Sequence, residues 1–281
     1  MNNNMRHLLC GVLILGLFVA CGGQPEPFTH EVLNSYTPVK SQGRSELCWV
    51  YAMLAAIETE HIMRGDSVHL SVAYVAHHLR RDSMAPRSGR GMAVTLLRMI
   101  GRYGLVPFES MPDTTRPAPQ WAFMLGNEYT PLEFAHSVCA PDEYVALTST
   151  PAHPYGTEVQ LSLPDNWTHE RFLNLHPDTL LALAERAVRQ GHGVCWEGDV
   201  GDPGFSWADG VARLSTLSGF SKVSDDHCMA IVGLARDAGG QRYFIMKNSW
   251  GTGNARQGLL YMSFPYFRRN TISVVLPRSQ L

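Results

Sequence analysis

Three residues of this 281-residue chain, Cys48, His227 and Asn248, could supply a nucleophile, a base and a group that orients the base. Cys48 directly follows the polar loop 41–47 and begins a run whose apolar residues recur at helical spacing. We therefore expect Cys48 in the first turn of a buried helix, where unpaired N–H groups and the positive end of the helix dipole stabilise a thiolate. A lone cysteine at such a place is more often simply part of the core. Chemistry at Cys48 thus requires a base from elsewhere in the chain.

His227 and Asn248 are the candidates for the base and its orienting group. His227 precedes an apolar run, residues 228–235, that is typical of a buried strand, and Asn248 ends a second such run, residues 242–248. The turn-rich stretch 237–240 (DAGG) between them predicts a β-hairpin. A hairpin brings His227 and Asn248 to the same end of a sheet. There the amide can hold the imidazole in the tautomer and orientation that face a thiol.

With these residues in this order, the chain resembles the papain superfamily of cysteine peptidases. Gln42 stands six residues before Cys48, where that family keeps the glutamine of its oxyanion hole, and His227 and Asn248 stand in its histidine and asparagine motifs (DH and NSWG). The match is closer to the bleomycin hydrolase and aminopeptidase C branch, through residues 163–167 (LPDNW), 196–200 (WEGDV) and 247–254 (KNSWGTGN). The resemblance extends from about Gln42 to about Leu276.

The resemblance implies hydrolysis of peptide bonds through an acyl-enzyme on Cys48. His227 is expected to stabilise the thiolate as imidazolium and to protonate the leaving amine, while Asn248 orients it. The Gln42 side chain and the Cys48 backbone N–H are expected to bind the oxyanion. Peptides are the expected substrates, and neither a cofactor nor a metal is expected. Two other function classes remain open: an inactive peptide-binding envelope lipoprotein, and an amidase or acyltransferase that uses the same triad.

The resemblance also implies two further site residues. Gly91 in the loop 88–91 (SGRG) aligns with the glycine whose backbone pairs with the substrate's P2 residue, and Trp250 is expected to shield the Asn248–His227 hydrogen bond. The alternatives are a loop that only leads into a helix for Gly91 and a core-filling ring for Trp250. Glu46, close to the nucleophile, would raise the thiol pKa if it pointed inward, but a loop glutamate more often faces water.

Which bonds are cut depends on how the cleft ends. In the bleomycin hydrolase branch a C-terminal arm lies in the cleft and limits cleavage to N-terminal residues. Here only residues 277–281 follow the last expected strand, and Pro277 restricts their direction. We therefore expect at least some cleavage of internal bonds, so that strict dependence on a free amine would count against this expectation. Much of the insertion that builds hexameric rings in that branch is lacking, and the oligomeric state is left open.

The composition is that of an ordinary enzyme, with 45% hydrophobic residues, 17% charged residues and a net charge of −2. The chain has no excess of basic residues, so its composition does not indicate nucleic acid as a partner. At the N-terminus, residues 8–20 form a 13-residue apolar run behind Arg6, which predicts a signal peptide over residues 1–20. The stretch 18–21 (FVAC) resembles a bacterial lipobox in which Cys21 is lipidated. We expect a lipid-anchored protein of the bacterial cell envelope, with an ordinary secretory signal and a secreted or periplasmic protein as the alternative.

The elements that must position the site divide the chain in two. Helices are expected at the nucleophile and over about 70–79, 92–103, 131–138 and 177–190, and strands over 194–196, 228–235, 242–248, 259–263 and 271–276. This predicts an α+β, papain-like, two-lobed fold with the active-site cleft between the lobes. The expected segments are a tether and lead-in (21–40), a helical lobe (41–130) and a lobe with an antiparallel sheet or barrel (131–281).

Two finer expectations concern side chains in these elements. Trp49, Met53 and Ile57 should form the core-facing side of the nucleophile helix, with Glu58 and Glu60 pointing outward. Cys195 and Cys228 lie in two strand-like runs, so a bridge between them is conceivable, but two buried free thiols are favoured.

Overall fold

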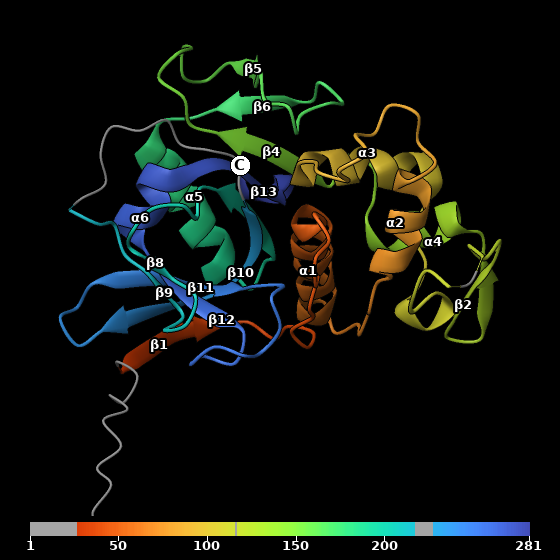
Figure 1. Ribbon diagram of the computed structural model, residues 1–281, viewed down its shortest axis with the longest axis horizontal. Coiled ribbons are helices and arrows are strands. Elements are labelled where there is room, and N and C mark those ends of the chain that lie inside the picture. The colour runs from red at the N-terminus through yellow and green to blue at the C-terminus, as the bar shows by residue number, and fades with distance from the viewer. Residues whose placement is uncertain (1–26, 116, 217–226) are drawn as a thin grey trace, which may run out of the picture.

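The nucleophile helix α1 (Cys48–Met63) stands in the middle of the molecule, between a helical part and a sheet part (Figure 1). The computed structural model describes residues 27–115, 117–216 and 227–281. Helices α2 (Val72–Leu79), α3 (Ala93–Tyr103) and α4 (Pro131–Val138) lie on one side of α1. An eleven-stranded sheet lies on its other side, together with α5 (Pro177–Arg189) and α6 (Phe264–Asn270). The predicted α+β arrangement is confirmed.

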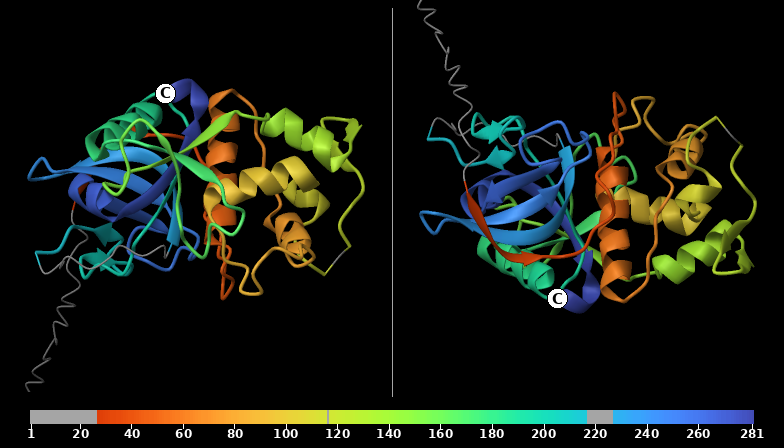
Figure 2. Two further views of the ribbon diagram at one scale, coloured as in Figure 1. Left: turned by 90° about the horizontal axis from the view of Figure 1, so that it is seen from above. Right: turned by 90° about the horizontal axis from the view of Figure 1, so that it is seen from below.

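The position of α1 makes one sequence-based expectation wrong. Glu58 and Glu60 do not point into solvent but are 0% and 2% exposed, because α1 lies between the helical part and the sheet part (Figure 2). The Glu58 carboxylate accepts hydrogen bonds from the Leu70 N–H at 2.8 Å and from the Lys40 Nζ at 3.1 Å. The Glu60 carboxylate pairs with His192 at 3.0 Å. Each buried carboxylate thus has polar partners, which is the condition for tolerating a charge in a protein interior.

The helix ends follow the local sequence closely. The Thr130 hydroxyl accepts from the Glu133 N–H while the Glu133 carboxylate accepts from the Thr130 N–H, a complete capping box with Pro131 at the first helical position. Ser71 caps α2 in the same manner by accepting from the Tyr74 N–H. The predicted spans of α2 to α5 are confirmed to within about two residues. Helix α4, expected in the sheet-bearing segment, packs against α3.

The sheet is mixed rather than purely antiparallel, because β4 pairs parallel with β6 and β9 pairs parallel with β12. Its order is β5-β6-β4-β13-β7-β10-β11-β12-β9-β8, with β1 added to β10. The strands are β1 (Phe28–Leu33), β4 (Tyr144–Thr148), β5 (Glu158–Gln160), β6 (Arg171–Asn174), β7 (Val194–Gly198), β8 (Phe205–Ser206), β9 (Val211–Ala212), β10 (His227–Asp237), β11 (Arg242–Lys247), β12 (Leu259–Ser263) and β13 (Thr271–Pro277).

Strand β10 pairs with three other strands of this sheet. Its first half pairs with β7, its second half pairs with β1, and β11 runs along its other edge. The connection to β11 is the predicted hairpin, in which Gly240 adopts φ +81°, a conformation that favours glycine. Since β10 begins at His227 and Asn248 directly follows β11, the hairpin returns the two residues to the same end of the sheet.

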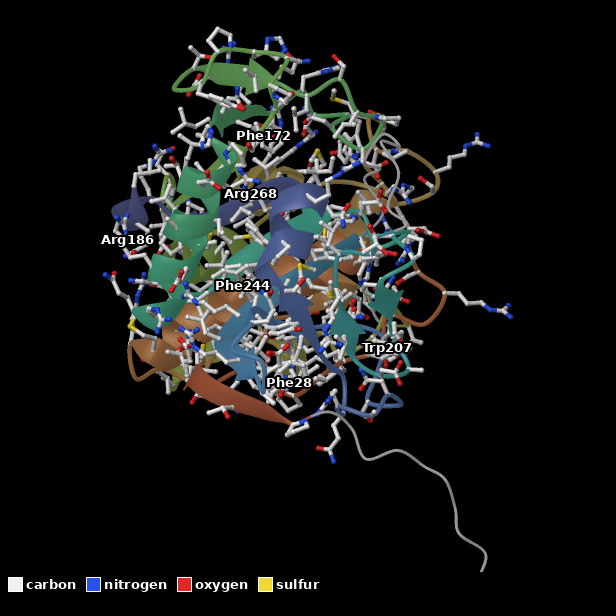
Figure 3. All side chains as sticks on the ribbon, turned by 90° about the vertical axis from the view of Figure 1, so that its left-hand side faces the viewer. Phe28, Phe172, Arg186, Trp207, Phe244 and Arg268 are labelled. Atoms are coloured by element: carbon white, nitrogen blue, oxygen red, sulfur yellow. The ribbon has the colours of Figure 1, made fainter. Side chains whose placement is uncertain are left out.

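Several helices and strands are not marked by a strong pattern in the local sequence. Strand β1 lies in the stretch expected only as tether and lead-in, and α6 lies between two predicted strands. Strands β4 to β6 and the short hairpin of β2 (Ala122–Met124) and β3 (Asn127–Tyr129) were also not expected. Helix α6 is stabilised by packing against the sheet near Phe244 of β11 (Figure 3). The Phe244 ring packs on Phe264 and Phe267 at centroid distances of 4.7 and 4.8 Å. No helix in the described part of the chain is long and apolar enough to span a membrane.

Candidate active site

Cys48 is the first residue of α1, as the sequence predicts. Leu47 precedes it at the N-cap position, and an aliphatic side chain cannot accept hydrogen bonds from the first N–H groups of the helix. The positive end of the helix dipole therefore lies at Cys48. Cys48 itself is partly exposed, whereas Trp49 behind it is fully buried.

His227 and Asn248 are joined by a direct hydrogen bond. The distance between His227 Nε2 and Asn248 Oδ1 is 2.7 Å, and both residues are buried. Because an amide oxygen can only accept, Nε2 carries the proton in this pair and Nδ1 is the ring nitrogen available to Cys48. Asn248 Oδ1 also accepts from the Ser249 N–H at 2.7 Å, which fixes the direction of the amide.

Trp250 covers the base. Its ring lies against the His227 ring at a centroid distance of 4.4 Å, and Phe205 and Trp207 meet it edge-on at 6.0 and 5.3 Å. This aromatic group packs on one side of His227, and shielding of the Asn248–His227 bond by Trp250 stays a prediction. The two explanations for Trp250, shielding and packing, describe the same contacts.

Gln42 is tied to the segment that follows Asn248. The Gln42 N–H donates to the Ser249 carbonyl at 2.7 Å, and the Gln42 side-chain oxygen accepts from the Ser249 hydroxyl at 2.6 Å. Gln42 Nε2 donates one hydrogen to the Ser45 carbonyl at 2.7 Å. An amide nitrogen carries two hydrogens, so the second can serve a substrate oxyanion. Gln42 is thereby positioned relative to both Cys48, six residues later, and Asn248.

The surroundings of Cys48 strongly favour the thiolate. The pKa of Cys48 is lowered to about 4, first by a hydrogen bond from the Cys228 thiol and then by the hydrogen bond and charge of His227. Burial raises the pKa of Cys48, but the hydrogen bonds and the charge together lower it by more. A thiol whose pKa is lowered to about 4 is largely thiolate at neutral pH, and the thiolate is the nucleophilic form of cysteine.

Cys228 is a site residue that the sequence interpretation missed. It follows His227 in β10 and is fully buried, and burial raises its pKa well above the usual range, so that it stays a thiol and donates to Cys48. On the adjacent strand β7, Cys195 is also a free thiol, so the expectation of two free thiols is confirmed. The local signal for Cys228 is weak: it is a polarisable residue directly after the candidate base.

A small pocket of about 10 Å³ opens beside Cys48, which is room for roughly one water-sized group. It is lined by Glu46, Cys48, Arg90, Gly91, Asp165, Glu197, His227 and Cys228. Gly91 thus lies next to the nucleophile, as the resemblance implies, although its contact with substrate stays a prediction. Glu46 is half-exposed and pairs with Arg90 at 3.7 Å instead of acting on the Cys48 thiol. Glu197 is a carboxylate within an otherwise apolar strand, and its sequence context did not assign it to the site.

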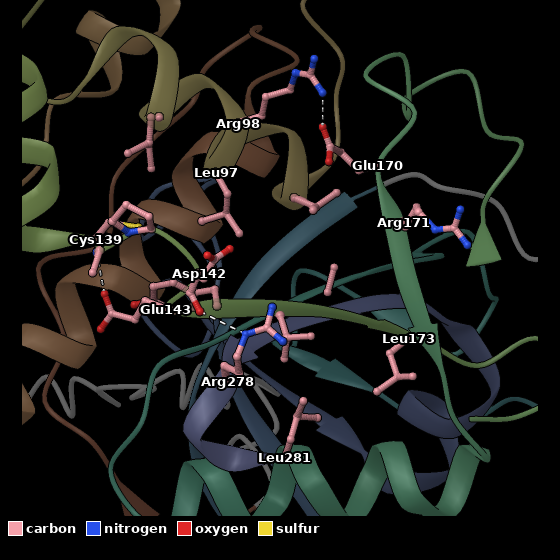
Figure 4. A pocket seen from close by; sticks show the side chains of 18 of the residues that line it. Leu97, Arg98, Cys139, Asp142, Glu143, Glu170, Arg171, Leu173, Arg278 and Leu281 are labelled. Atoms are coloured by element: carbon pink, nitrogen blue, oxygen red, sulfur yellow. Dashed lines mark hydrogen bonds and ion pairs between the residues drawn. The ribbon is translucent and has the colours of Figure 1, made fainter. Parts of the chain in front are cut away.

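A wider pocket of about 440 Å³ lies elsewhere, between α3, the end of α4 and strands β4 and β6 (Figure 4). Its charged side chains are largely paired: Arg98 with Glu170 at 3.1 Å, and Arg278 with the Asp142 carbonyl at 3.1 Å. The one cysteine on its wall, Cys139, has its pKa raised to about 12 by burial and by Glu143. Cys139 is therefore a poor nucleophile, and among the described cysteines Cys48 is the one whose pKa is lowered.

Among the described residues there is no group of three or more His, Cys, Asp or Glu side chains that could hold a metal ion. Cys21 and the expected signal peptide lie outside the described residues, so their fate stays a prediction.

Residues 186–271 match the family model described as papain family cysteine protease, a stretch that holds His227, Asn248 and Trp250 but not Cys48. Aminopeptidase G of Lactobacillus delbrueckii subsp. lactis is 30% identical over 166 residues, which are 50% of this chain and 36% of that protein. Aminopeptidase E of Lactobacillus helveticus is 28% identical over 181 residues, 57% of this chain and 41% of that protein. The chain thus spans less than half the length of these relatives.

Solved structures show the same architecture over almost the whole chain. PepW from Lactobacillus rhamnosis superposes with a TM-score of 0.70 at 17% identity, covering 90% of this chain and 82% of that one. The bromelain protease from Ananas comosus superposes with a TM-score of 0.53 at 18% identity, covering 86% and 93%. At this level of identity the likeness shows a papain-like fold.

Proposed function

We propose that this chain, which carries a segment of the papain family of cysteine proteases on a papain-like fold, is a cysteine peptidase with Cys48 as its nucleophile. The observation that carries the proposal is the placement of His227 between Asn248, at 2.7 Å, and a Cys48 thiol whose pKa is lowered to about 4. The thiolate is the form that a sulfur nucleophile needs, and the other three described cysteines all have raised pKa values.

The reaction follows from these positions. The Cys48 thiolate attacks the carbonyl carbon of the scissile bond, and the resulting oxyanion accepts hydrogen bonds from the Cys48 N–H and a Gln42 side-chain N–H, each worth about 3 kcal/mol in acyl transfer. The imidazolium of His227 gives its Nδ1 proton to the leaving amine as the C–N bond breaks. Neutral His227 then takes a proton from water, which hydrolyses the thioester and restores the thiolate. Asn248 keeps the ring aligned through both steps.

The test is covalent labelling together with product analysis. A thiol-directed peptide epoxide should add once to the protein, at Cys48, and unstructured peptides incubated in parallel should be cut. An unlabelled, inactive protein would contradict the proposal and favour a peptide-binding role. Labelling with turnover of acyl-amines but not of peptides would instead indicate an amidase or acyltransferase.

We further propose that the protein is held at a bacterial membrane through lipidation of Cys21. The support is the sequence pattern alone: a 13-residue apolar run that ends in FVAC. Two or three acyl chains anchor a protein stably, whereas a single chain does not. Cys21→Ser should release the protein or leave the precursor unprocessed. If the variant fractionates like the wild type and neither carries a lipid mass, the protein is secreted or periplasmic by an ordinary signal.

A further inference from the structure

Two cysteines lie in contact at the nucleophile. Cys48, the first residue of α1, is partly exposed, whereas Cys228, the second residue of β10, is buried. Both line the small pocket of about 10 Å³, and both pack into the same hydrophobic cluster. The Cys228 thiol donates a hydrogen bond to the Cys48 sulfur, so the two sulfur atoms are direct neighbours. The pair therefore consists of one sulfur that small molecules can reach and one that the protein covers.

The pleat of β10 directs the Cys228 side chain toward α1. Side chains alternate between the two faces of a strand, so Cys228, Ala230 and Val232 share one face. Ala230 and Val232 belong to a buried cluster that includes Ala55 of α1, and β10 lies beside this helix (Figure 1). Cys228 is thus on the face of the sheet that packs against the nucleophile helix, while His227 occupies the other face of the same strand.

A third free thiol, Cys195, is close to Cys228 but less well placed to bond with it. Strand β7 pairs with β10 so that Cys195 lies opposite Ala230, and Glu197 lies opposite Cys228. Cys195 and Cys228 are therefore diagonal neighbours, which in a sheet are about 7–8 Å apart. The Cα atoms of a disulfide are usually about 4.4–6.8 Å apart. Cys48, whose sulfur already contacts the Cys228 thiol, is the better partner.

The contact between the two sulfurs becomes important when the nucleophile meets a peroxide. An exposed thiolate is the form of cysteine that peroxides oxidise most readily, and its first product is a sulfenic acid. A sulfenic acid can condense with a thiol, whereas further oxidation to sulfinic and sulfonic acids is irreversible. The pocket beside Cys48 has room for roughly one water-sized group, and Cys228 forms part of its wall. The Cys228 thiol is therefore next to the place where an oxygen atom would be added.

We propose that Cys48 and Cys228 are a reversible oxidation site, at which hydrogen peroxide converts the two thiols into a disulfide and a thiol reductant restores them. In the first step the Cys48 thiolate attacks one oxygen of hydrogen peroxide, the O–O bond breaks, and the released hydroxide takes a proton from solvent. In the second step the Cys228 sulfur attacks the sulfur of the Cys48 sulfenic acid. The S–O bond breaks, and the hydroxyl group leaves as water with the Cys228 proton. The two sulfurs together lose two electrons, and one peroxide is reduced to two waters.

This site goes beyond the proposed function, because it does not depend on peptide hydrolysis. It needs only a reactive sulfur at Cys48 and a thiol in contact with it. A disulfide at Cys48 removes the nucleophile, so that any reaction at this residue stops until the disulfide is reduced. Cys228 thereby protects Cys48 from irreversible oxidation.

The test measures how much of the oxidised Cys48 a reductant restores. The protein is treated with hydrogen peroxide and then with dithiothreitol, and iodoacetamide labelling of Cys48 is measured by peptide mass spectrometry after each treatment. In the wild type, peroxide should join the peptides of Cys48 and Cys228 with the loss of two hydrogens, and dithiothreitol should restore most of the labelling. In Cys228→Ala, Cys48 should continue to sulfinic and sulfonic acids, so the restored fraction should be about 10-fold lower than in the wild type. Because the fraction refers only to Cys48 that has been oxidised, a slower oxidation of the variant does not change it.

Cys195→Ala is the matched control. It removes a similarly buried thiol from the adjacent strand, and its restored fraction should equal that of the wild type. Cys228→Ser keeps the size of the side chain but cannot form a disulfide, so it should act like Cys228→Ala and replaces that variant if the latter fails to fold. Three results would overturn the inference: a disulfide between Cys195 and Cys228, wild-type Cys48 found only as sulfinic or sulfonic acid, or a restored fraction that the Cys228 variants do not lower.

Peptide hydrolysis is measured separately, so that the two proposals can fail separately. A protein that forms the Cys48–Cys228 disulfide but hydrolyses no peptide supports the oxidation site and contradicts peptidase activity. A protein that hydrolyses peptides but whose Cys48 is oxidised irreversibly supports peptidase activity and contradicts the oxidation site.

Discussion

Two cysteines of this protein lie at opposite ends of helices and have opposite acidities. Cys48 begins α1, and its pKa is lowered to about 4, whereas Cys139 directly follows α4, and its pKa is raised to about 12. Burial opposes the thiolate at both places. The difference comes from the neighbours of each sulfur: the Cys228 thiol and His227 lower the pKa of Cys48, whereas the Glu143 carboxylate adds to the effect of burial at Cys139. The residue type alone therefore does not make a nucleophile.

The largest effect should come from removing the nucleophile itself. Cys48→Ala should lower kcat/KM for peptide hydrolysis by about 10⁴-fold or more, as for other enzymes that lose the attacking atom. Cys139→Ala should change it by less than about 2-fold, because loss of one buried sulfur away from the site affects stability and not chemistry. Circular dichroism should show both variants folded. Near-wild-type hydrolysis by Cys48→Ala would refute the assignment of the nucleophile.

The second test removes the groups that distinguish the two sulfurs. His227→Ala deletes the proton donor and should lower kcat/KM by roughly 10³-fold, within the usual range for general acid–base groups. Asn248→Ala deletes one hydrogen bond of about 1.5–3 kcal/mol to a charged ring, which corresponds to roughly 10- to 100-fold. Steady-state kinetics of the two variants with one peptide substrate give the comparison. Equal losses would mean that Asn248 does more than orient His227.

A third test concerns the pH range of the thiolate. Because the pKa of Cys48 is lowered to about 4, the rate of its alkylation by iodoacetamide should rise with pH through a midpoint near 4. The rate should reach its maximum by neutral pH. Cys228→Ala removes the hydrogen bond that contributes most to this lowering, so the midpoint should move to higher pH. Rates of alkylation at Cys48 across about pH 3–9, a range that includes both the lowered pKa and the usual thiol pKa of about 8.5, measure both midpoints. An unmoved midpoint would assign the lowering to His227 and the helix instead.

The smallest effect is expected at the other cysteine. Glu143→Gln removes a negative charge near Cys139, but burial is the first cause of its raised pKa and is unchanged. The alkylation rate of Cys139 at pH 8 should therefore rise by only about 2- to 3-fold, the size expected when a partly exposed charge is removed. A thiol that becomes as reactive as Cys48 in this variant would show that the carboxylate, and not the helix end and burial, determines the contrast.

The candidate site could be predicted in large part because its residues carry local signals. Cys48 follows a loop and begins an apolar helix, and the hairpin that brings His227 to Asn248 is marked by a turn between two apolar strands. Helix limits were also predictable, since Pro131, Thr130 and Glu133 form their cap within four residues. Such features depend on hydrogen bonds and periodicity over a few positions, which one sequence contains in full.

Other parts of the site arise only where distant segments meet. Cys228 lies against Cys48 because β10 packs on the first turns of α1, and Arg90 meets Asp165 across 75 positions of sequence. No local pattern specifies either contact. Glu58 and Glu60 show the same limit, because their polarity indicates solvent until the two lobes enclose α1.

The sequence by itself determined the order of the reactive residues, the spans of four helices and the α+β division of the chain. The tertiary structure decided how acidic the Cys48 thiol is, how the mixed sheet is ordered and which distant residues line the pocket beside Cys48. The physical reason is the range of the forces involved: helix caps and turns are satisfied by neighbours in the chain. A pKa and a cleft depend instead on every group within a few ångströms in space, whatever its position in the sequence.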